Sequence, residues 1–428
     1  MNFSIAKRTK GLLLIIFLFG APTLQAESYN NLKQAVKNPL KVTRLNLKNK
    51  RFKKFPAVIF SFKNLVSLNL YWNQIKVLPE RIGELEKLRS LNLHWNYIIK
   101  IPKSIGKLKK LRNFDIGYNK VRDIPKEIGL LQNLKKLNIS RNRLKKLPPE
   151  FSQLENLKYL QIQKNYFPRL PFVVTKLKKL QSLNIRESRL AELPPEIGNL
   201  TNLKTLLAAD NRIVNIPKSL GSLINLVQLE IYNNNIKEIP SSIGNLKNLK
   251  KFNAYNNQIT RLPTQIGGLA SIVKLSFSSN KLVQLPKEIG KLSNLKELIL
   301  SGNKIASLPN EIGNLKNLQV LRLSSNKLTT FPKAIGQLTK LYEIYAMDNL
   351  LQSIPQEVGK LTNMVELMLD GNKLKTLPDS MKSLKKLKYM VIEGNPIRSI
   401  QREVCNLPKL KINKDDKIFL KYCHKYRR

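Results

Sequence analysis

LVSLNLYWNQIKVLPERIGELEK, at residues 65–87, is the unit from which almost the whole chain is built. The next 23 residues repeat it in phase, so that Leu68, Asn73 and Pro79 recur one period later. Sixteen copies run over residues 42–409 without an insertion or a deletion. Self-similarity at a fixed period of this length predicts a solenoid. We therefore expect one elongated domain, although a length of 428 residues alone would suggest two or three.

Each unit contains a short strand and an inward-facing polar residue. Apolar and polar residues alternate in the LxL segment, which predicts a strand with its leucines inward. The ninth position is Asn in fourteen repeats, from Asn73 to Asn395, and its amide can bond backbone groups of the turn. Lys50 and Ser188 are the exceptions. We expect their repeats to be the least regular, because a hydroxyl cannot supply the two donors of an amide.

The second half of the unit turns the chain back on itself. Pro follows the last inward residue in fifteen repeats, from Pro56 to Pro378, and we expect it to end the strand and begin a 3-10 helix or a single helical turn. Gly lies four positions later in eleven repeats, from Gly83 to Gly359, which predicts a positive φ as that turn ends. The spacing LxxLxLxxNxL is that of a leucine-rich repeat. The predicted fold class is α/β: a leucine-rich-repeat solenoid, or horseshoe, with a parallel β-sheet on the concave face and short 3-10 or helical turns on the convex face.

The first 26 residues differ from the rest. Basic residues, among them Lys7, precede the apolar run at residues 11–20, and a small residue, Ala26, ends the segment. This pattern predicts a secretory signal peptide over residues 1–26, since the apolar run is short for a membrane span. A retained membrane anchor is the alternative.

Two caps are expected to close the ends of the solenoid, because terminal repeats need a polar outer surface. Residues 27–41 are predicted to be the N-terminal cap, with an amphipathic helix over residues 28–38. Residues 410–428 are predicted to be the C-terminal cap. In an exported chain, Cys405 and Cys423 are expected to form a disulfide there; in a reducing compartment they would be two free thiols.

The 23-residue repeat, the segment LKQAVKNPL at residues 32–40 and the predicted signal peptide together resemble the exported leucine-rich-repeat proteins of pathogenic spirochaetes. The resemblance covers nearly the whole chain, although the same repeat class occurs in intracellular scaffolds of plants and animals. It implies a secreted or surface-exposed protein that binds host-cell receptors, matrix components or glycans and has no enzymatic activity. The strongly basic charge and the aromatic, Asn-rich concave face depart from that pattern.

The net charge is +48, from 76 Lys and Arg against 28 Asp and Glu, which favours anionic partners. The variable positions of the sixteen strands hold only nine basic and ten acidic residues, so the excess lies on the edges and the convex side. One edge column supplies a candidate polyanion-binding row. It contains Lys120, Arg143, Arg189, Arg212, Lys281, Lys304 and Lys327. The alternative for this row is a solvated surface that keeps the protein soluble.

Two groups on the concave face are candidate ligand-binding residues. The first is aromatic and offers a platform for a sugar ring, an apolar loop or a cation, or else a ladder that only stiffens the first repeats. It contains Tyr71, Trp72, His94, Trp95, Tyr97 and Tyr118. The second combines acidic and apolar side chains near the C-terminus and suits a basic protein partner. It contains Tyr345, Met347, Asp348, Met368, Asp370 and Glu393.

Enzymatic functions have little support. No His, Cys and acidic residues group at metal-ligand spacing and no phosphate-binding glycine loop is present, so no cofactor or metal is expected. We expect a monomeric, exported binding protein whose concave face holds a protein or a glycan. The alternatives are an adhesin that binds polyanions, such as sulfated glycans, through its basic exterior, and an intracellular scaffold.

Overall fold

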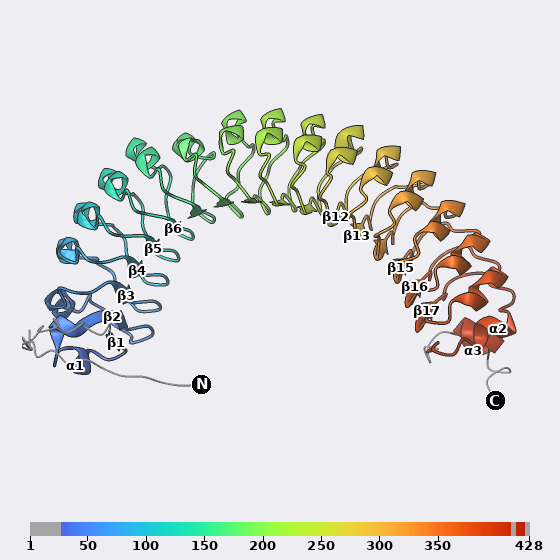
Figure 1. The fold of residues 1–428 in the computed structure, drawn as a ribbon, viewed down its shortest axis with the longest axis horizontal. Coiled ribbons are helices and arrows are strands. Elements are labelled where there is room, and N and C mark those ends of the chain that lie inside the picture. Colours follow the sequence, from blue (N-terminus) through green and yellow to red (C-terminus); the bar gives the residue numbers. More distant parts are fainter. Residues whose placement is uncertain (1–26, 412–416, 424–428) are drawn as a thin grey trace, which may run out of the picture.

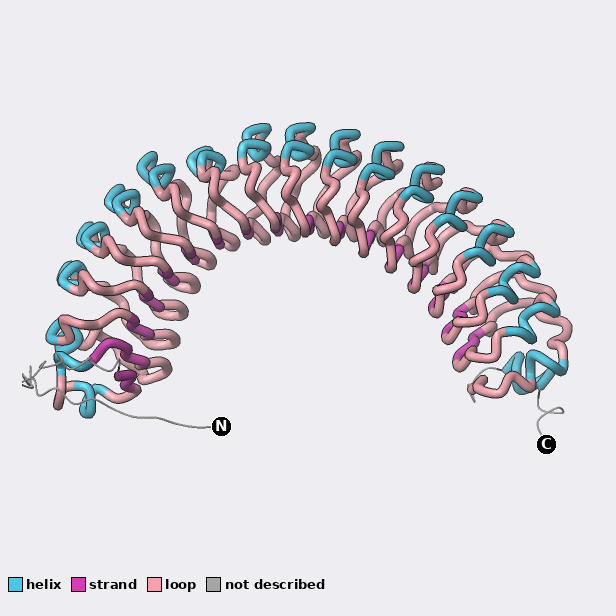
Figure 2. The backbone as a smooth tube through the Cα atoms, viewed as in Figure 1, coloured by secondary structure: helices cyan, strands magenta, loops and turns pink. Residues whose placement is uncertain are grey.

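The computed structural model describes residues 27–411 and 417–423. The chain forms an arc of stacked coils, with strands on the inner side and short helices on the outer side (Figure 1, Figure 2). This arrangement confirms the predicted horseshoe. The predicted signal peptide, residues 1–26, lies outside the described residues. Within them, no helix combines the length and the apolar character that crossing a membrane requires.

All strands belong to one parallel sheet along the inner side of the arc. Each pairs with the strand one period later, so that Leu68 lies opposite Leu91. The inward leucines form one continuous core and are almost fully buried. The repeat strands β2 to β17 are Val42–Asn46, Ser67–Asn69, Ser90–Asn92, Asn113–Asp115, Lys136–Asn138, Tyr159–Gln161, Ser182–Asn184, Thr205–Leu207, Gln228–Glu230, Lys251–Asn253, Lys274–Ser276, Glu297–Ile299, Val320–Arg322, Glu343–Tyr345, Glu366–Met368 and Tyr389–Val391.

Fifteen 3-10 helices line the outer side, each preceded by one of the fifteen prolines, as predicted. Proline fixes φ and donates no backbone hydrogen bond, so it ends strand pairing and begins the turn. The helices η2 to η16 are Ala57–Ser61, Glu80–Glu84, Lys103–Lys107, Lys126–Leu130, Pro149–Gln153, Phe172–Lys176, Pro195–Asn199, Lys218–Ser222, Ser241–Asn245, Thr264–Gly268, Lys287–Lys291, Asn310–Asn314, Lys333–Gln337, Gln356–Lys360 and Asp379–Ser383.

The predicted positive φ of the outer glycines is wrong. Gly83 and its equivalents lie inside the 3-10 helices, and the only positive-φ glycines of the described residues lie on the inner side. The outer glycines are needed for close approach instead. A Cβ at Gly83 would lie 2.8 Å from the carbonyl oxygen of Ser104, in the next turn. Glycine therefore lets successive outer turns stack.

Gly359→Ala is expected to lower the melting temperature. Its Cβ would lie 2.4 Å from the Ser380 carbonyl oxygen, and relieving such overpacking costs about 1–3 kcal/mol. Thermal unfolding followed by circular dichroism measures the effect. Lys382→Ala, at the equivalent exposed position of the next turn, is the control and should change stability by less than about 0.5 kcal/mol. Equal melting temperatures for the two variants would contradict the stacking role.

The ladder of inward Asn side chains supplies the hydrogen bonds expected of it. Asn96 shows the pattern: its Nδ2 donates to the carbonyl oxygens of Leu70 and Leu93, at 3.0 and 3.1 Å. Its Oδ1 accepts from the backbone N–H of Ile75 at 3.0 Å. One amide therefore ties each repeat to the repeat before it.

The two repeats without this Asn are irregular, as predicted. Arg51 and Arg189, which follow Lys50 and Ser188, adopt positive φ angles of 57° and 58°. The Ser188 hydroxyl donates to its neighbour, the carbonyl oxygen of Arg186, at 3.0 Å. Neither Lys50 nor Ser188 thus provides the amide bridge to the preceding repeat.

Ser188→Asn is expected to raise stability by about 1 kcal/mol, because the new amide can donate to Ile162 and accept from Phe167, as other ladder residues do at these places. The urea midpoint should rise relative to the natural chain. Ser278→Asn, on the concave strand face, should not reproduce the gain. A lower urea midpoint for Ser188→Asn would mean that this repeat cannot accommodate an inward Asn side chain.

The N-terminal cap differs from the prediction. The helix α1 comprises only Leu32–Ala35 rather than residues 28–38, and the strand β1, Glu27–Tyr29, precedes it. β1 pairs in parallel with β2, so it covers the backbone groups that the first repeat would leave unpaired. The short 3-10 helix η1, Pro39–Lys41, leads into β2. Three residues carry too little strand pattern to be recognised in the sequence.

At the other end, the helix α2, Arg402–Cys405, replaces the last 3-10 turn where Gln401 stands in place of proline. The helix α3, Lys417–Cys423, packs beside it (Figure 1). A disulfide joins Cys405 to Cys423 with 5.3 Å between the Cα atoms. Both cysteines are fully buried, so the bridge ties α3 to the end of the solenoid.

Candidate ligand-binding face

One position in every repeat, directly before the Asn ladder, has a left-handed backbone with a positive φ angle. The residues at this position are Asn49, Trp72, Trp95, Tyr118, Arg141, Lys164, Glu187, Asp210, Asn233, Asn256, Ser279, Gly302, Ser325, Asp348, Gly371 and Gly394. Gly, Asn and Asp tolerate this conformation, and they fill most of the later repeats. Bulky residues hold this conformation at a cost of order 1 kcal/mol or more each, and the aromatic residues at 72, 95 and 118 carry that cost.

Trp72, Trp95 and Tyr118 form what we call the aromatic ladder. The ring centroids of Trp72 and Trp95 are 5.5 Å apart with planes at 21°, and those of Trp95 and Tyr118 are 4.9 Å apart at 36°. The three side chains nevertheless remain 49%, 41% and 39% exposed. The Trp95 ring therefore has a neighbouring ring against each of its faces, whereas Trp72 is stacked on one side only.

Tyr71 and His94 form a second row against the ladder. The Tyr71 ring centroid lies 5.8 Å from that of His94 and meets the Trp95 ring edge-on at 6.3 Å. The His94 ring lies 6.2 Å from Tyr118. The structure thus brings together five of the six predicted aromatic residues.

Tyr97 is the sixth, and the expectation that it lies beside the others is wrong. Its side chain is 45% exposed, but its ring contacts the Lys120 ammonium at 4.9 Å, and it lines a hollow on the flank together with Lys76. Tyr97 follows the ladder Asn in its repeat, where the chain has already turned away from the concave face. We therefore exclude it from the candidate site.

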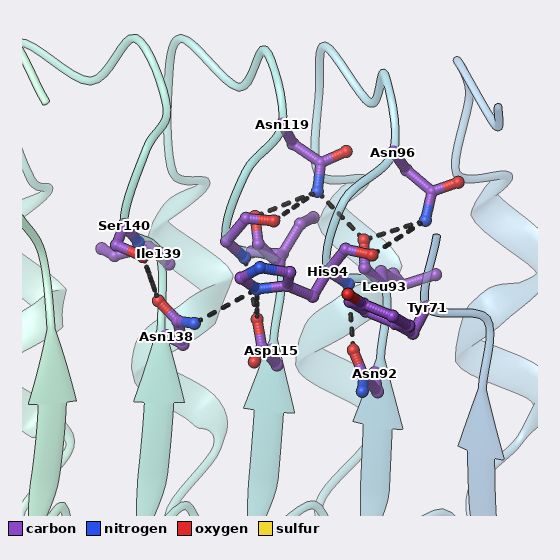
Figure 3. A network of polar contacts seen from close by, with 12 residues as sticks. Tyr71, Asn92, Leu93, His94, Asn96, Asp115, Asn119, Asn138, Ile139 and Ser140 are labelled. Carbon is purple, nitrogen blue, oxygen red and sulfur yellow. Dashed lines mark hydrogen bonds and ion pairs between the residues drawn. The ribbon is translucent and has the colours of Figure 1, made fainter. Parts of the chain in front are cut away.

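A polar network orients His94 (Figure 3). Its Nδ1 lies 3.0 Å from a carboxylate oxygen of Asp115 and 3.4 Å from the Asn138 amide nitrogen. The shorter contact favours the tautomer that donates from Nδ1 to the carboxylate. Gly117 makes this approach possible, since a Cβ there would lie 2.8 Å from His94 Nδ1.

A shallow hollow of about 450 Å³ lies on the sheet next to this network, over β4 to β7. Its lining includes the polar side chains of Asn92, Asn113, Asp115 and Lys136. The Asn92 Oδ1 already accepts from the backbone N–H of His94 at 3.0 Å. The ladder and this hollow together form a face with apolar ring edges on one side and amide and charged groups on the other.

Four ion pairs join charged side chains of the concave face beyond the aromatic ladder. Lys164 forms an ion pair with Glu187, and Arg186 with Glu230. Each pair joins basic and acidic residues on the concave side of different repeats. The concave face is therefore close to neutral, in agreement with its nine basic and ten acidic residues.

The second predicted patch lies on β15 to β17, near the opposite end of the arc from the ladder (Figure 1). The Tyr345 hydroxyl donates a hydrogen bond to Glu366, and this bond, together with burial and the charge of Glu366, raises the pKa of Tyr345 to about 12. Arg322 lies 5.0 Å from the Tyr345 ring and 3.4 Å from Glu343. Met347, Met368 and Asp370 are partly buried, whereas Asp348 and Glu393 are exposed.

The predicted polyanion-binding row lies on the flank where the strands end, and all seven of its side chains are exposed. None of them belongs to an ion pair within residues 27–411 and 417–423. In the same residues, no three His, Cys, Asp or Glu side chains gather as a metal site would require.

Comparisons with known proteins agree with this architecture. A family model described as a leucine-rich repeat region matches residues 103–186, 153–233, 218–302 and 286–390, and a leucine-rich-repeat model matches residues 41–98. No protein among those with curated descriptions matches the chain.

Solved structures include several similar solenoids. A leucine-rich-repeat protein of Leptospira interrogans is 37% identical, with a TM-score of 0.77 over 85% of this chain and 99% of that one. The plant peptide hormone receptor RGFR1, in complex with RGF2, is 27% identical with a TM-score of 0.72, over 87% and 66% of the two chains. The ectodomain of a membrane receptor kinase of Arabidopsis thaliana, in complex with CASPARIAN STRIP INTEGRITY FACTOR 2, is 27% identical with a TM-score of 0.70, over 86% and 48%. From the family models and the identity to the Leptospira protein, this chain belongs to the leucine-rich-repeat family.

Proposed function

We propose that the chain is a non-enzymatic binding protein, exported from the cell, that holds a protein ligand on the concave face of its first repeats. The aromatic ladder carries this proposal. Two Trp and one Tyr occupy a backbone conformation that bulky residues adopt at a cost, and they remain exposed. Strain and exposed aromatic surface together favour a binding role over a stabilising one.

A protein ligand suits the ladder better than a sugar does. A sugar ring packs against the face of an aromatic ring, whereas the Trp95 faces are already opposed by Trp72 and Tyr118. Ring edges and indole N–H groups suit apolar side chains and backbone carbonyls. Similar solenoids are solved in complex with peptide hormones, which supports the same choice.

Export is supported by the pattern of residues 1–26 and by the similarity to a receptor ectodomain. Exposure on the cell surface or release from the cell would bring the concave face to proteins of another cell. The acidic patch on β15 to β17 would contact a basic segment of the same ligand, because Asp348 and Glu393 remain exposed there.

Affinity capture tests the proposal. The mature chain, residues 27–428, is immobilised and exposed to cell-surface proteins at 150 mM NaCl, and retained proteins are identified by mass spectrometry. We expect a retained protein that is lost when Trp72 and Trp95 are replaced. Retention of the same proteins by both chains would contradict the proposed site.

A further inference from the structure

Three hollows follow one another along the flank where the strands end, over the early repeats. The first, of about 630 Å³, lies beside Lys53, Lys76 and Tyr97. The second, of about 590 Å³, lies beside Arg122, Arg143 and Tyr166. The third, of about 550 Å³, shares Lys145 and Lys146 with the second, so these two are continuous, and its far side is lined by Glu192 and Glu196.

Cations are concentrated along the same flank. The three positions of each repeat equivalent to Arg51, Lys53 and Lys54 hold eleven cations and one acid, Asp123, in the first six repeats. At the same positions, the next ten repeats hold ten cations and two acids, so the number of cations per repeat is roughly half as large. We call these three positions of the first six repeats the basic flank. All eleven of its cations are exposed, and none forms an ion pair with another described residue.

The row of cations is long and its spacing is fixed by the fold. Successive repeats stand about 4.8 Å apart at the sheet, so six repeats span at least roughly 24 Å. Such a row matches a linear anion with charges at intervals along its length better than a single small anion. Binding would release the counter-ions of both partners and fall steeply with salt.

The aromatic side chains of the flank argue against nucleic acid as that anion. Single-stranded nucleic acids bind by stacking their bases on free aromatic faces. The Tyr97 face instead carries the ammonium of Lys120 at 4.9 Å, and the one other aromatic side chain at these positions, Tyr166, is 56% exposed. Two rings, one of them covered by a lysine, accompany eleven exposed cations, so the flank offers many charges and few stacking surfaces.

We propose that the basic flank binds a sulfated polysaccharide. The sulfate groups would lie along the cations, with sugar units in the hollows between them. This site is separate from the aromatic ladder, which lies on the concave face, and the inference does not depend on the proposed protein ligand.

The test uses immobilised heparin, a highly sulfated polysaccharide, and two variants of equal charge. The flank variant carries Lys76→Gln, Arg122→Gln, Arg143→Gln and Lys146→Gln. The control variant carries Lys237→Gln, Lys373→Gln, Lys375→Gln and Arg398→Gln, from two of the same three columns of later repeats. We expect the flank variant to bind heparin at least about 10-fold more weakly than the natural chain at 150 mM NaCl. The slope of log K against log salt concentration should be smaller in magnitude by about 3–4. The affinity of the control variant should stay within about 3-fold of the natural chain.

Three results would overturn the proposal, given that circular dichroism shows both variants folded. Equal losses in the two variants would mean that net charge alone attracts heparin. Equal binding of desulfated heparin would remove the role of sulfate, and tighter binding of single-stranded DNA would favour a nucleic acid. A chain with Trp72 and Trp95 replaced should bind heparin normally, so the failure of one site is distinguishable from failure of the other.

Discussion

The double variant Trp72→Asn with Trp95→Asn is expected to bind the captured protein ligand on the order of 100-fold more weakly, or worse, while remaining fully folded. Removing an aromatic side chain that is buried at the centre of an interface weakens the binding free energy by about 2 kcal/mol or more. Asn is chosen because it tolerates the positive φ angles of 54° and 58° at these two positions. Calorimetry with the purified ligand measures the affinity.

The melting temperature of the double Trp variant distinguishes the loss of a binding contact from misfolding. Relief of backbone strain contributes about 1 kcal/mol per position and offsets the loss of ring stacking, which is worth about 0.5–1.5 kcal/mol per pair. The melting temperature should therefore change little. Tyr255→Asn, which removes an exposed concave aromatic outside the ladder, is the control and should bind normally. Unchanged affinity in the double Trp variant would show that the ladder only stiffens the first repeats.

Salt provides a second check on the same variant. A contact made by aromatic edges should lose little affinity between low and high NaCl concentration, whereas a polyanion contact should weaken steeply. If ligand affinity falls with salt as steeply as heparin binding does, the ligand is held by the basic exterior rather than by the ladder.

Asn234→Leu is expected to cause the largest loss of stability, about 3 kcal/mol or more. The Asn234 amide donates to the carbonyl oxygens of Ala208 and Ile231 and accepts from the backbone N–H of Ile213, at 3.0 to 3.1 Å. Leu fills the space but leaves the buried Ile213 N–H without its partner, at about 1–3 kcal/mol, and removes one of the two amide donors to each carbonyl oxygen, at about 1 kcal/mol each. Urea unfolding should show a lower midpoint.

The neighbouring residue supplies the matched control. Asn235 is exposed, and its side chain forms no hydrogen bond to the described residues, so Asn235→Leu should leave the urea midpoint nearly unchanged. Ser188→Asn should move the midpoint in the opposite direction. Similar midpoints for Asn234→Leu and Asn235→Leu would mean that the Asn ladder is not what joins the repeats.

Periodicity predicts the features that depend on one repeat and its neighbour. The 23-residue spacing sets the strand register and so predicts from sequence alone that Leu68 lies opposite Leu91, as it does. Proline chemistry predicts where the outer turns begin, and the change from Asn to Ser188 predicts a local irregularity. These inferences hold because the same local interactions recur in each coil.

Features that depend on backbone conformation or on side-chain direction could not be predicted. The column of positive φ angles is visible in the sequence only through the Gly, Asn and Asp residues of the later repeats, such as Gly302 and Asn233, because bulky residues hide it in the early repeats. The outer glycines have a steric role that appears only when neighbouring coils are in place. Ring orientation likewise decides whether Trp95 offers a face or an edge, and sequence does not encode it directly.

Tryptophan fluorescence is the most direct measurement of whether ligand contacts the ladder, because the chain has only two tryptophans and both, Trp72 and Trp95, belong to it. Titration of the captured ligand into the mature chain should shift or quench their emission, and the change should saturate with the dissociation constant that calorimetry gives. Binding that reaches saturation while the tryptophan emission stays constant would contradict a ligand site on this part of the concave face.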